Sequence, residues 1–325
     1  MRAVTLDRWF DEPELQAAPL RVAYGMGVDS TAMLVGMWQR GIRPFAITYA
    51  DTGAEKPETY AYLETIQAWC REVGFPAIEV VRNAPTVGKN GTYATIEQNV
   101  LVNGTLPSLA FGGRACSEKW KHVPQHRYAQ NWPEAQAAWA AGLKVLVAIG
   151  YDAGLKDCKR SEVASDKHYN YCYPLREWGW DRERCEREIA EAGLPVPPKS
   201  ACFFCPSSKP DEVRGLSHDL LRRVIAIEAG AQPRQDERRA ADQSAINGLW
   251  RRAVKGCRGA TAKPDSMAEF IMGEELLPEF AGQTLVDPWW HRNHDGKGVT
   301  PTNPDFRPAM AQAVVASKRR LAMVA

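Results

Sequence analysis

Apolar and polar residues follow two distinct rhythms along the first half of the chain. Short apolar runs rich in β-branched or aromatic residues predict strands, and apolar positions three or four residues apart predict amphipathic helices. Strands are expected at 21–25, 44–49, 77–81 and 144–149, with helices at 29–40 and 56–73. This alternation predicts an α/β fold: a parallel sheet with helices on both faces, and ligand sites at the carboxyl ends of its strands.

The pattern changes after residue 180. A helix is expected at 181–192, before Gly193, and the proline-punctuated segment that follows contains no regular element. Residues 211–258 are mainly helical and arginine-rich, and 288–308 read as irregular. We therefore predict an N-terminal extension over 1–18, an α/β domain over 19–195, and a cysteine loop with a mainly helical C-terminal region over 196–325.

Composition narrows the classes of function. The 325 residues contain 41 Lys and Arg against 39 Asp and Glu, a formal net charge of +2. This balance excludes a disordered or collagen-like chain and a protein that binds nucleic acid by a global basic field. One short patch, residues 250–258, combines Trp250 with four cations and keeps a nucleic-acid partner as a hypothesis. No apolar run fits a secretory signal or a membrane helix, so we expect a cytoplasmic protein with no membrane partner.

Residues 24–31 form a glycine-punctuated turn between the first strand and the first helix. Glycines let backbone N–H groups approach an anion, and a helix N-terminus adds further donors and a partial positive charge. Ser30 and Thr31 offer hydroxyl donors, while Asp29 offers a helix cap or a metal ligand. On the two glycines alone an ordinary capped turn is the favoured interpretation, because the segment is neither a Walker loop nor a dinucleotide fingerprint.

The end of the second strand adds a further motif, Asp51-Thr52-Gly53 followed by Pro57-Glu58-Thr59. With Gly25-x-Gly27-x-Asp29-Ser30, it resembles the PP-loop ATP pyrophosphatase superfamily, in the phosphoadenylyl-sulfate (PAPS) reductase-like branch. That branch includes the sulfurtransferase-like component of DNA phosphorothioation systems. The resemblance covers about residues 20–210, and its further matches are Arg114-x-Cys116-Ser117, Lys121, Pro124, Gly150, Arg160, Tyr173-Pro174-Leu175 and 198–206. It departs from the commonest pattern at Gly25 and Met26, where many members have serine and glycine.

The resemblance implies an adenine nucleotide alpha hydrolase-like fold that binds ATP and Mg²⁺. In the family's chemistry, a substrate oxygen attacks the α-phosphate, pyrophosphate leaves, and a sulfur or nitrogen nucleophile then displaces AMP. Positioning, Mg²⁺ and cations suffice for such a transfer. The implied catalytic residues are Asp29, Lys121 and Arg160. The implied nucleotide-binding residues are Tyr24, Gly25, Met26, Gly27, Val28, Asp29, Ser30, Thr31, Asp51, Thr52, Gly53, Arg114 and Gly150.

Cysteines form a second candidate site. Cys202-x-x-Cys205 lies in a proline-flanked loop and fits half of a four-thiolate metal site, a redox pair, or coincidence. Its spacing from Cys116 and Cys185 resembles that in iron–sulfur members of the superfamily, which implies a [4Fe–4S] cluster, with Zn²⁺ as the alternative. Of the other cysteines, Cys158 and Cys172 are reserve ligands, Cys70 is expected in the core, and Cys257 is unassigned.

Three functions remain open. The first is ATP-dependent adenylation for sulfur transfer or a related modification of a nucleic acid, with a cysteine desulfurase or thioredoxin-like protein as sulfur donor. The second is reduction of PAPS or adenylyl sulfate, which is disfavoured because a cysteine-containing C-terminal motif and an adjacent cysteine pair are both missing. The third is a nucleotide-binding accessory subunit of a defence or mobile-element complex. Intact Asp29-Ser30 and Asp51-Thr52-Gly53 favour an enzyme over an accessory subunit.

Overall fold

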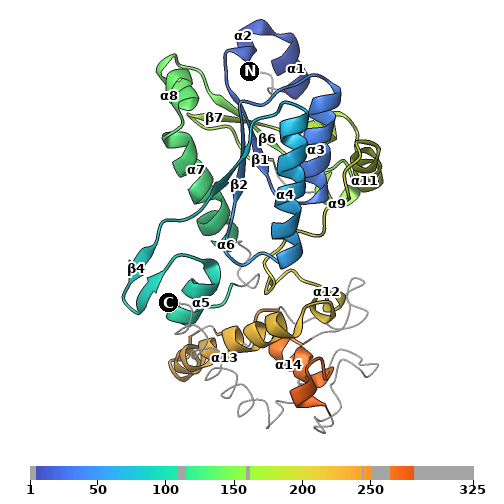
Figure 1. Ribbon diagram of the computed structural model, residues 1–325. Coiled ribbons are helices and arrows are strands. Elements are labelled where there is room, and N and C mark those ends of the chain that lie inside the picture. The colour runs from blue at the N-terminus through green and yellow to red at the C-terminus, as the bar shows by residue number, and fades with distance from the viewer. Residues whose placement is uncertain are drawn as a thin grey trace. The chain divides into compact units, whose positions relative to one another are not determined.

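The computed structural model describes residues 5–107, 115–158, 162–243, 245–246, 248–250 and 264–281 (Figure 1). The chain divides into two compact units. The first contains Met1–Asn83 and Glu118–Ala201, and the second contains Ala84–Ser117 and Cys202–Ala325. The sequence predicts divisions after residues 18 and 195, and it carries no signal that sets residues 84–117 apart from their neighbours.

The first unit is built on a five-stranded sheet in which every neighbouring pair of strands is parallel. This confirms the expected α/β class with a parallel sheet. The strand order is β3-β2-β1-β6-β7, so the chain winds one way from β1 and then returns to the other side of it. Such a reversal creates a switch point between β1 and β6, where α/β proteins commonly bind ligands. The strands are β1 (Leu20–Tyr24), β2 (Ala46–Ala50), β3 (Ile78–Val81), β6 (Val145–Ile149) and β7 (Tyr169–Cys172).

Both faces of this sheet are covered by helices (Figure 1). Side chains alternate along a strand, so Leu20, Val22 and Tyr24 of β1 face one way and Arg21 and Ala23 the other. The first face packs on α3 (Val28–Gln39), α4 (Pro57–Glu72) and α11 (Arg182–Glu191). The second packs on α7 (Val123–Gln130) and α8 (Pro133–Ala140). Shorter helices of this unit are α1 (Leu6–Asp11), α2 (Pro13–Gln16), α9 (Leu155–Cys158), α10 (Pro174–Glu177) and a π-helix (Glu118–His122).

The second unit is mainly helical, as expected for the C-terminal region. Its strands β4 (Thr86–Gly88) and β5 (Gly91–Tyr93) form an antiparallel hairpin. Its helices are α5 (Ile96–Asn103), α6 (Ala115–Ser117), α12 (Pro210–Arg214), α13 (His218–Ala240), α14 (Met267–Gly273) and the 3-10 helix Pro278–Phe280. No helix in the described part of the chain combines the length and apolar character needed to cross a bilayer.

A buried carboxylate organises the second unit. Glu228 of α13 has no exposed surface, and its Oε1 accepts hydrogen bonds from the backbone N–H groups of Leu249 (2.6 Å) and Met267 (2.9 Å). Its Oε2 accepts from Ser266 Oγ (2.6 Å) and the Ala268 N–H (2.9 Å). Burial raises the pKa of Glu228, and these four donors oppose that rise. The carboxylate thereby fixes the start of α14 and the 248–250 segment to α13.

Candidate functional site

The loop after β1 has the backbone of a tight, glycine-type turn. Met26 adopts a positive φ of 60° although it is not a glycine. Its side chain is completely buried, which offsets the conformational strain of about 1–3 kcal/mol. Met26 therefore takes a left-handed conformation at the position where many PP-loop proteins have glycine. The helix cap is Gly27 and not Asp29, so the capping role considered for Asp29 is wrong.

Several side chains of the loop are buried beneath the turn and stabilise it. Tyr24, Val28 and Thr31 are buried, and the Tyr24 phenol is 2.9 Å from Thr31 Oγ1. Ser30 Oγ lies 3.3 Å from the Gly27 nitrogen and 3.1 Å from the Gly27 oxygen. The predicted hydroxyl donors are thus engaged within the turn. The backbone N–H groups in the first turn of α3 remain the donors that a helix start directs outward.

The two loop glycines are not required by the packing of the protein. Neither Gly25 nor Gly27 has a positive φ. A Cβ atom on Gly25 would lie 3.7 Å from Ser30 Oγ, and one on Gly27 would lie 4.0 Å from Ser200 Cβ. Both are ordinary contact distances. Each position therefore has room for a Cβ atom, and the packing of the loop does not itself require glycine there.

Gly150, in contrast to Gly25 and Gly27, has no room for a Cβ atom. It follows β6 directly, and a Cβ there would lie 2.9 Å from the Ser30 nitrogen and 3.1 Å from the Asp29 carbonyl carbon. Because these are backbone atoms, no side-chain rotation could relieve the overlap. Glycine at this position lets the end of β6 lie against the first turn of α3, at the switch point of the sheet.

Three carboxylates meet at the same place. Asp29 (α3), Asp152 (after β6) and Asp157 (α9) each place an oxygen within 4.8 Å of the other two, and no other such group of His, Cys, Asp or Glu occurs in the described ranges. The Nη1 atom of Arg182, at the start of α11, lies 3.1 Å from Asp29 Oδ1. Burial raises the pKa of Asp29, Asp152 and Asp157 raise it further, and Arg182 lowers it. Clustered carboxylate oxygens are ligands that suit Mg²⁺.

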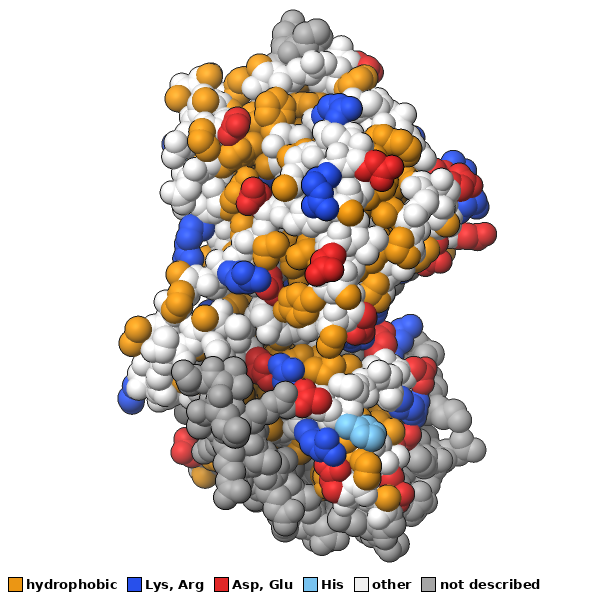
Figure 2. Space-filling model, viewed as in Figure 1, with side chains coloured by type: hydrophobic (Ala, Val, Ile, Leu, Met, Phe, Trp, Pro, Cys, Tyr) orange, Lys and Arg blue, Asp and Glu red, His pale blue; other side chains and the backbone are white. Residues whose placement is uncertain are grey.

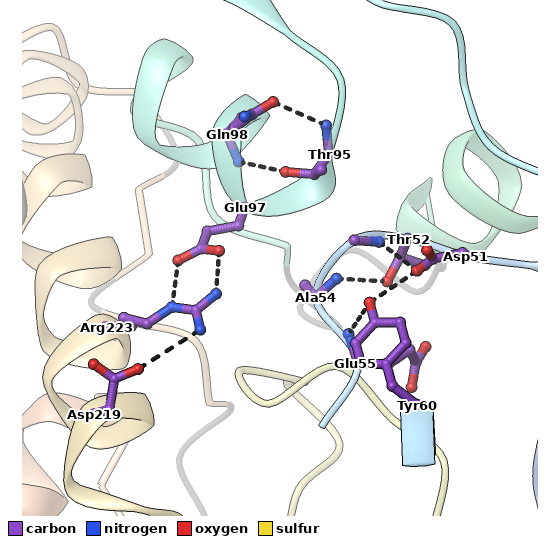
Figure 3. A network of polar contacts seen from close by, with 11 residues as sticks. Asp51, Thr52, Ala54, Glu55, Tyr60, Thr95, Glu97, Gln98, Asp219 and Arg223 are labelled. Carbon is purple, nitrogen blue, oxygen red and sulfur yellow. Dashed lines mark hydrogen bonds and ion pairs between the residues drawn. The ribbon is translucent and has the colours of Figure 1, made fainter. Parts of the chain in front are cut away.

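The carboxylate of Asp51 braces the loop after β2. It accepts a hydrogen bond from the Tyr60 hydroxyl at 2.8 Å (Figure 3). It also accepts from the Gly53 N–H and from Arg82 Nε, each at 2.8 Å. Gly53 has a φ of 72°, which favours glycine. Burial and the nearby Asp51 raise the pKa of Tyr60, which keeps its hydroxyl a donor. Asp51 therefore fixes the shape of this loop by accepting hydrogen bonds from three donors. The Asp29 carboxylate differs, because it lies beside two other carboxylates.

Lys121 reaches the loop after β2 from the π-helix. Its Nζ lies 3.3 Å from Oε1 of Glu55, whose side chain is fully buried. The other oxygen of Glu55 lies 3.4 Å from Ser200 Oγ, and Ser200 is the neighbour closest to the open side of Gly27. The loops after β1 and β2 are thereby linked through Glu55. Sequence reasoning named Lys121 but missed Glu55, Ser200, Asp152, Asp157 and Arg182, because only their position in space marks them.

Several predicted residues lie outside the described residues. They are Arg114, Arg160, Cys257, and the remainder of the 250–258 patch. Trp250 itself is buried and packs edge-on against Phe270, with ring centroids 5.2 Å apart. Its ring is therefore unavailable for stacking on a nucleobase. Basic and acidic side chains are interspersed on the face seen in Figure 2.

Arginines of α13 are held by carboxylates of their own unit. Arg223 forms a two-pronged pair with Glu97 and also approaches Asp219 (Figure 3). The Arg222 Nε lies 2.7 Å from Glu279 Oε1. These pairs agree with the expectation that most of the arginine-rich region is ordinary salt-bridged helix surface.

The predicted metal-binding cysteines have different environments. Cys202 and Cys205 stand at the two ends of one turn, in which the Cys205 N–H donates to the Cys202 carbonyl at 3.0 Å. Cys116 lies in α6 of the same unit. Cys185 belongs to the first unit and is fully buried in its core, and burial raises the pKa of its thiol to about 12. A metal cluster on these four residues stays a prediction.

Neither a protein-family model nor a curated protein matches the chain. Assignment of a function therefore depends on the motifs, on the fold, and on the residues that meet at the switch point.

Proposed function

We propose that this protein is a PP-loop type ATP pyrophosphatase that adenylates its substrate, for sulfur transfer or a related modification of a nucleic acid. A substrate oxygen attacks the α-phosphorus, the bond from that phosphorus to the bridging oxygen breaks, and pyrophosphate leaves. The observation that carries the proposal is the convergence of the glycine loop, Gly150 and the Asp29–Asp152–Asp157 cluster at the switch point between β1 and β6.

The loop after β1 has the features that a polyphosphate requires. The first turn of the twelve-residue helix α3 supplies outward N–H donors. Gly25 is exposed, and a Cβ atom on Gly25 or Gly27 would meet only ordinary contacts, with Ser30 Oγ and Ser200 Cβ. Phosphate oxygens could therefore approach the backbone closely.

Charge in the site fits a nucleotide bound with a divalent cation. The carboxylates of Asp29, Asp152 and Asp157 are the residues that would hold Mg²⁺. Bound Mg²⁺ would neutralise charge on the polyphosphate and on the departing pyrophosphate. Lys121 supplies a side-chain cation in the same unit, held by the buried Glu55. Its role is to stabilise negative charge that develops on the leaving group.

The sulfur-transfer part of the proposal rests on Cys202 and Cys205. Their turn places two half-buried thiols within one short loop, an arrangement that suits a thiolate-bound metal or a thiol relay. Cys185 fits less well, because metal ligands must be deprotonated and burial disfavours the thiolate. The adenylation step itself requires no metal cluster.

Pyrophosphate release from ATP tests the proposal. We expect wild type to release pyrophosphate in the presence of its acceptor, and Asp29→Asn to lose at least about tenfold in rate. Asp211→Asn is the matched control, because the Asp211 side chain is 90% exposed and pairs with Arg214 in the second unit. Equal rates in wild type and Asp29→Asn would contradict the assignment. ATP binding without release would favour the accessory subunit, and sulfite formation from PAPS with thioredoxin would favour the reductase.

A further inference from the structure

Arg21 is a buried cation with no ionic partner. It lies in the central strand β1 and only 3% of its surface is exposed. Its Nη1 donates to Thr48 Oγ1 at 3.0 Å and to Gln125 Oε1 at 2.9 Å, both of them neutral groups. Its Nε is buried and makes no hydrogen bond. Within the described residues, no carboxylate pairs with this guanidinium.

An uncompensated charge at this position is unfavourable. Moving an ion out of water costs several kcal/mol even in a real protein interior, and arginine does not escape the cost by losing its proton. The two neutral acceptors on Nη1 offset part of that cost. The Nε atom belongs to the edge that forms two-pronged bonds with carboxylate or phosphate, and it has no hydrogen-bond partner among the described residues.

The surroundings of Arg21 are those of an anion site. Tyr128, Tyr169 and Tyr171 lie near enough for its charge to oppose the burial that raises the pKa of each phenol. Tyr169 and Tyr171 lie in β7, on the sheet face that packs on α7 and α8, and Tyr128 lies on α7 itself. Neutral phenols can donate hydrogen bonds, so they would add to recognition of an oxyanion without introducing a competing negative charge.

The guanidinium also extends along β1 towards the carboxyl ends of the strands, where residues on this face are only partly buried. Thr48, which accepts from Nη1, is the register partner of Ala23, two residues further along β1 than Arg21. On the same face, Ala23, Ile149 and Tyr171 are only partly buried. The charge therefore reaches from the start of β1 towards its carboxyl end, where the covering of this face is incomplete.

We propose that Arg21 anchors a second anion site, which binds the phosphate, sulfate or carboxylate group of a small molecule on the α7 and α8 face. The loop after β1 leads into α3 on the opposite face, so this site is separate from the proposed nucleotide loop. The inference goes beyond adenylation and does not depend on it. The oxyanion would take two hydrogen bonds from the Nε edge of Arg21 and further bonds from tyrosine hydroxyls.

Nitrogen-15 NMR of arginine Nε–H groups tests this site directly, with inorganic phosphate, sulfate and acetate titrated separately against chloride at equal ionic strength. The Arg21 signal is assigned by its absence in Arg21→Lys, which keeps the charge but removes the two-pronged edge. We expect that signal to shift in a saturable way with at least one oxyanion. The same shift should persist in Asp29→Asn, which separates this site from the nucleotide loop.

Two variants give the affinity test. Arg21→Lys should weaken the oxyanion about tenfold, and Tyr171→Phe by roughly three- to tenfold. Arg43→Lys is the matched control, because Arg43 is exposed and donates to the carbonyls of Val73 and Gly74. If Arg21→Lys does not fold, the Arg21 Nε–H signal is assigned by triple-resonance NMR of wild type, and wild type and Tyr171→Phe then decide. An Arg21 signal that does not move, or that moves equally with chloride, would overturn the proposal.

Discussion

Asp29 and Arg182 form an ion pair that joins the first turn of α3 to the first turn of α11, with 3.1 Å between Oδ1 and Nη1. The Arg182 side chain is 52% exposed and that of Asp29 is 25% exposed. The pKa of Asp29 is raised, chiefly by burial and further by Asp152 and Asp157, and Arg182 opposes that rise.

Removing the arginine should raise the pKa of Asp29. Burial and the two neighbouring carboxylates already raise it above its ordinary value of 3.8, and Arg182 is the group that opposes them. A carboxyl group whose pKa is raised in the folded state stabilises the fold at pH values below its unfolded-state pKa. This contribution is lost as the pH rises through its folded-state pKa. In Arg182→Gln that loss should extend to higher pH. Carbon-13 NMR titration of the Asp29 carboxyl measures the shift.

Arg184→Gln is the control for that titration, since Arg184 lies on the same helix and pairs with Glu188. Added Mg²⁺ should lower the Asp29 pKa in wild type and in Arg182→Gln. An Asp29 pKa that does not respond to loss of Arg182 would contradict the electrostatic description of the cluster.

Glycine substitutions should separate packing from ligand binding. Gly150→Ala forces a Cβ to within 2.9 Å of the Ser30 backbone nitrogen, and we expect a loss of about 1–3 kcal/mol in the free energy of unfolding. Gly25→Ala has room in the fold, so its stability should stay within about 0.5 kcal/mol of wild type. Its pyrophosphate release should nevertheless fall. Urea unfolding and the ATP assay on both variants provide the comparison, and equal stability of the two would refute the packing argument.

Tyr60→Phe should weaken the loop after β2. It removes the 2.8 Å hydrogen bond to the buried carboxylate of Asp51, so we expect destabilisation by about 1 kcal/mol. Arg82→Ala is the comparison variant, because the Arg82 side chain is 65% exposed although Asp51 is buried, and solvent screening of the arginine should keep the loss below about 1 kcal/mol. Calorimetric unfolding of both proteins tests the order. A larger loss in Arg82→Ala would show that the exposed pair, not the tyrosine, braces Asp51.

Glu228→Gln should be the most destabilising conservative change in the second unit. The amide replaces one acceptor oxygen with an NH₂ donor, which would face hydrogen-bond donors such as Ser266 Oγ and the Ala268 N–H. We expect a loss of roughly 3 kcal/mol or more. Glu279→Gln should lose less than about 1 kcal/mol, because its pair with Arg222 is exposed. Chemical unfolding followed by tryptophan fluorescence measures both, and similar losses would disprove a special role for Glu228.

The local pattern of apolar and polar residues was sufficient to predict most of the strands of the first unit. The strands expected at 21–25, 44–49, 77–81 and 144–149 correspond to β1, β2, β3 and β6 within about two residues at each end. Strand β7 was missed because Tyr169–Cys172 lacks the β-branched apolar residues that marked the equally short β3, and its strand character depends on pairing with β6. Helix α7 was missed because it has few apolar residues, and α8 because its apolar face is short and rich in alanine.

The sequence by itself determined the alternation of strands and helices, the glycine turn after the first strand, and the Asp51-Thr52-Gly53 loop, because each depends on residues close together in the chain. Tertiary structure decided what the carboxylates do. The Asp51 carboxylate accepts hydrogen bonds from three donors, whereas the Asp29 carboxylate lies beside Asp152 and Asp157. That difference follows from the strand order, which brings the end of β6 against α3 across more than a hundred residues of chain. The separation of Arg21 from every carboxylate in the described part of the chain is likewise a property of the packed sheet, since its burial arises only when distant segments meet.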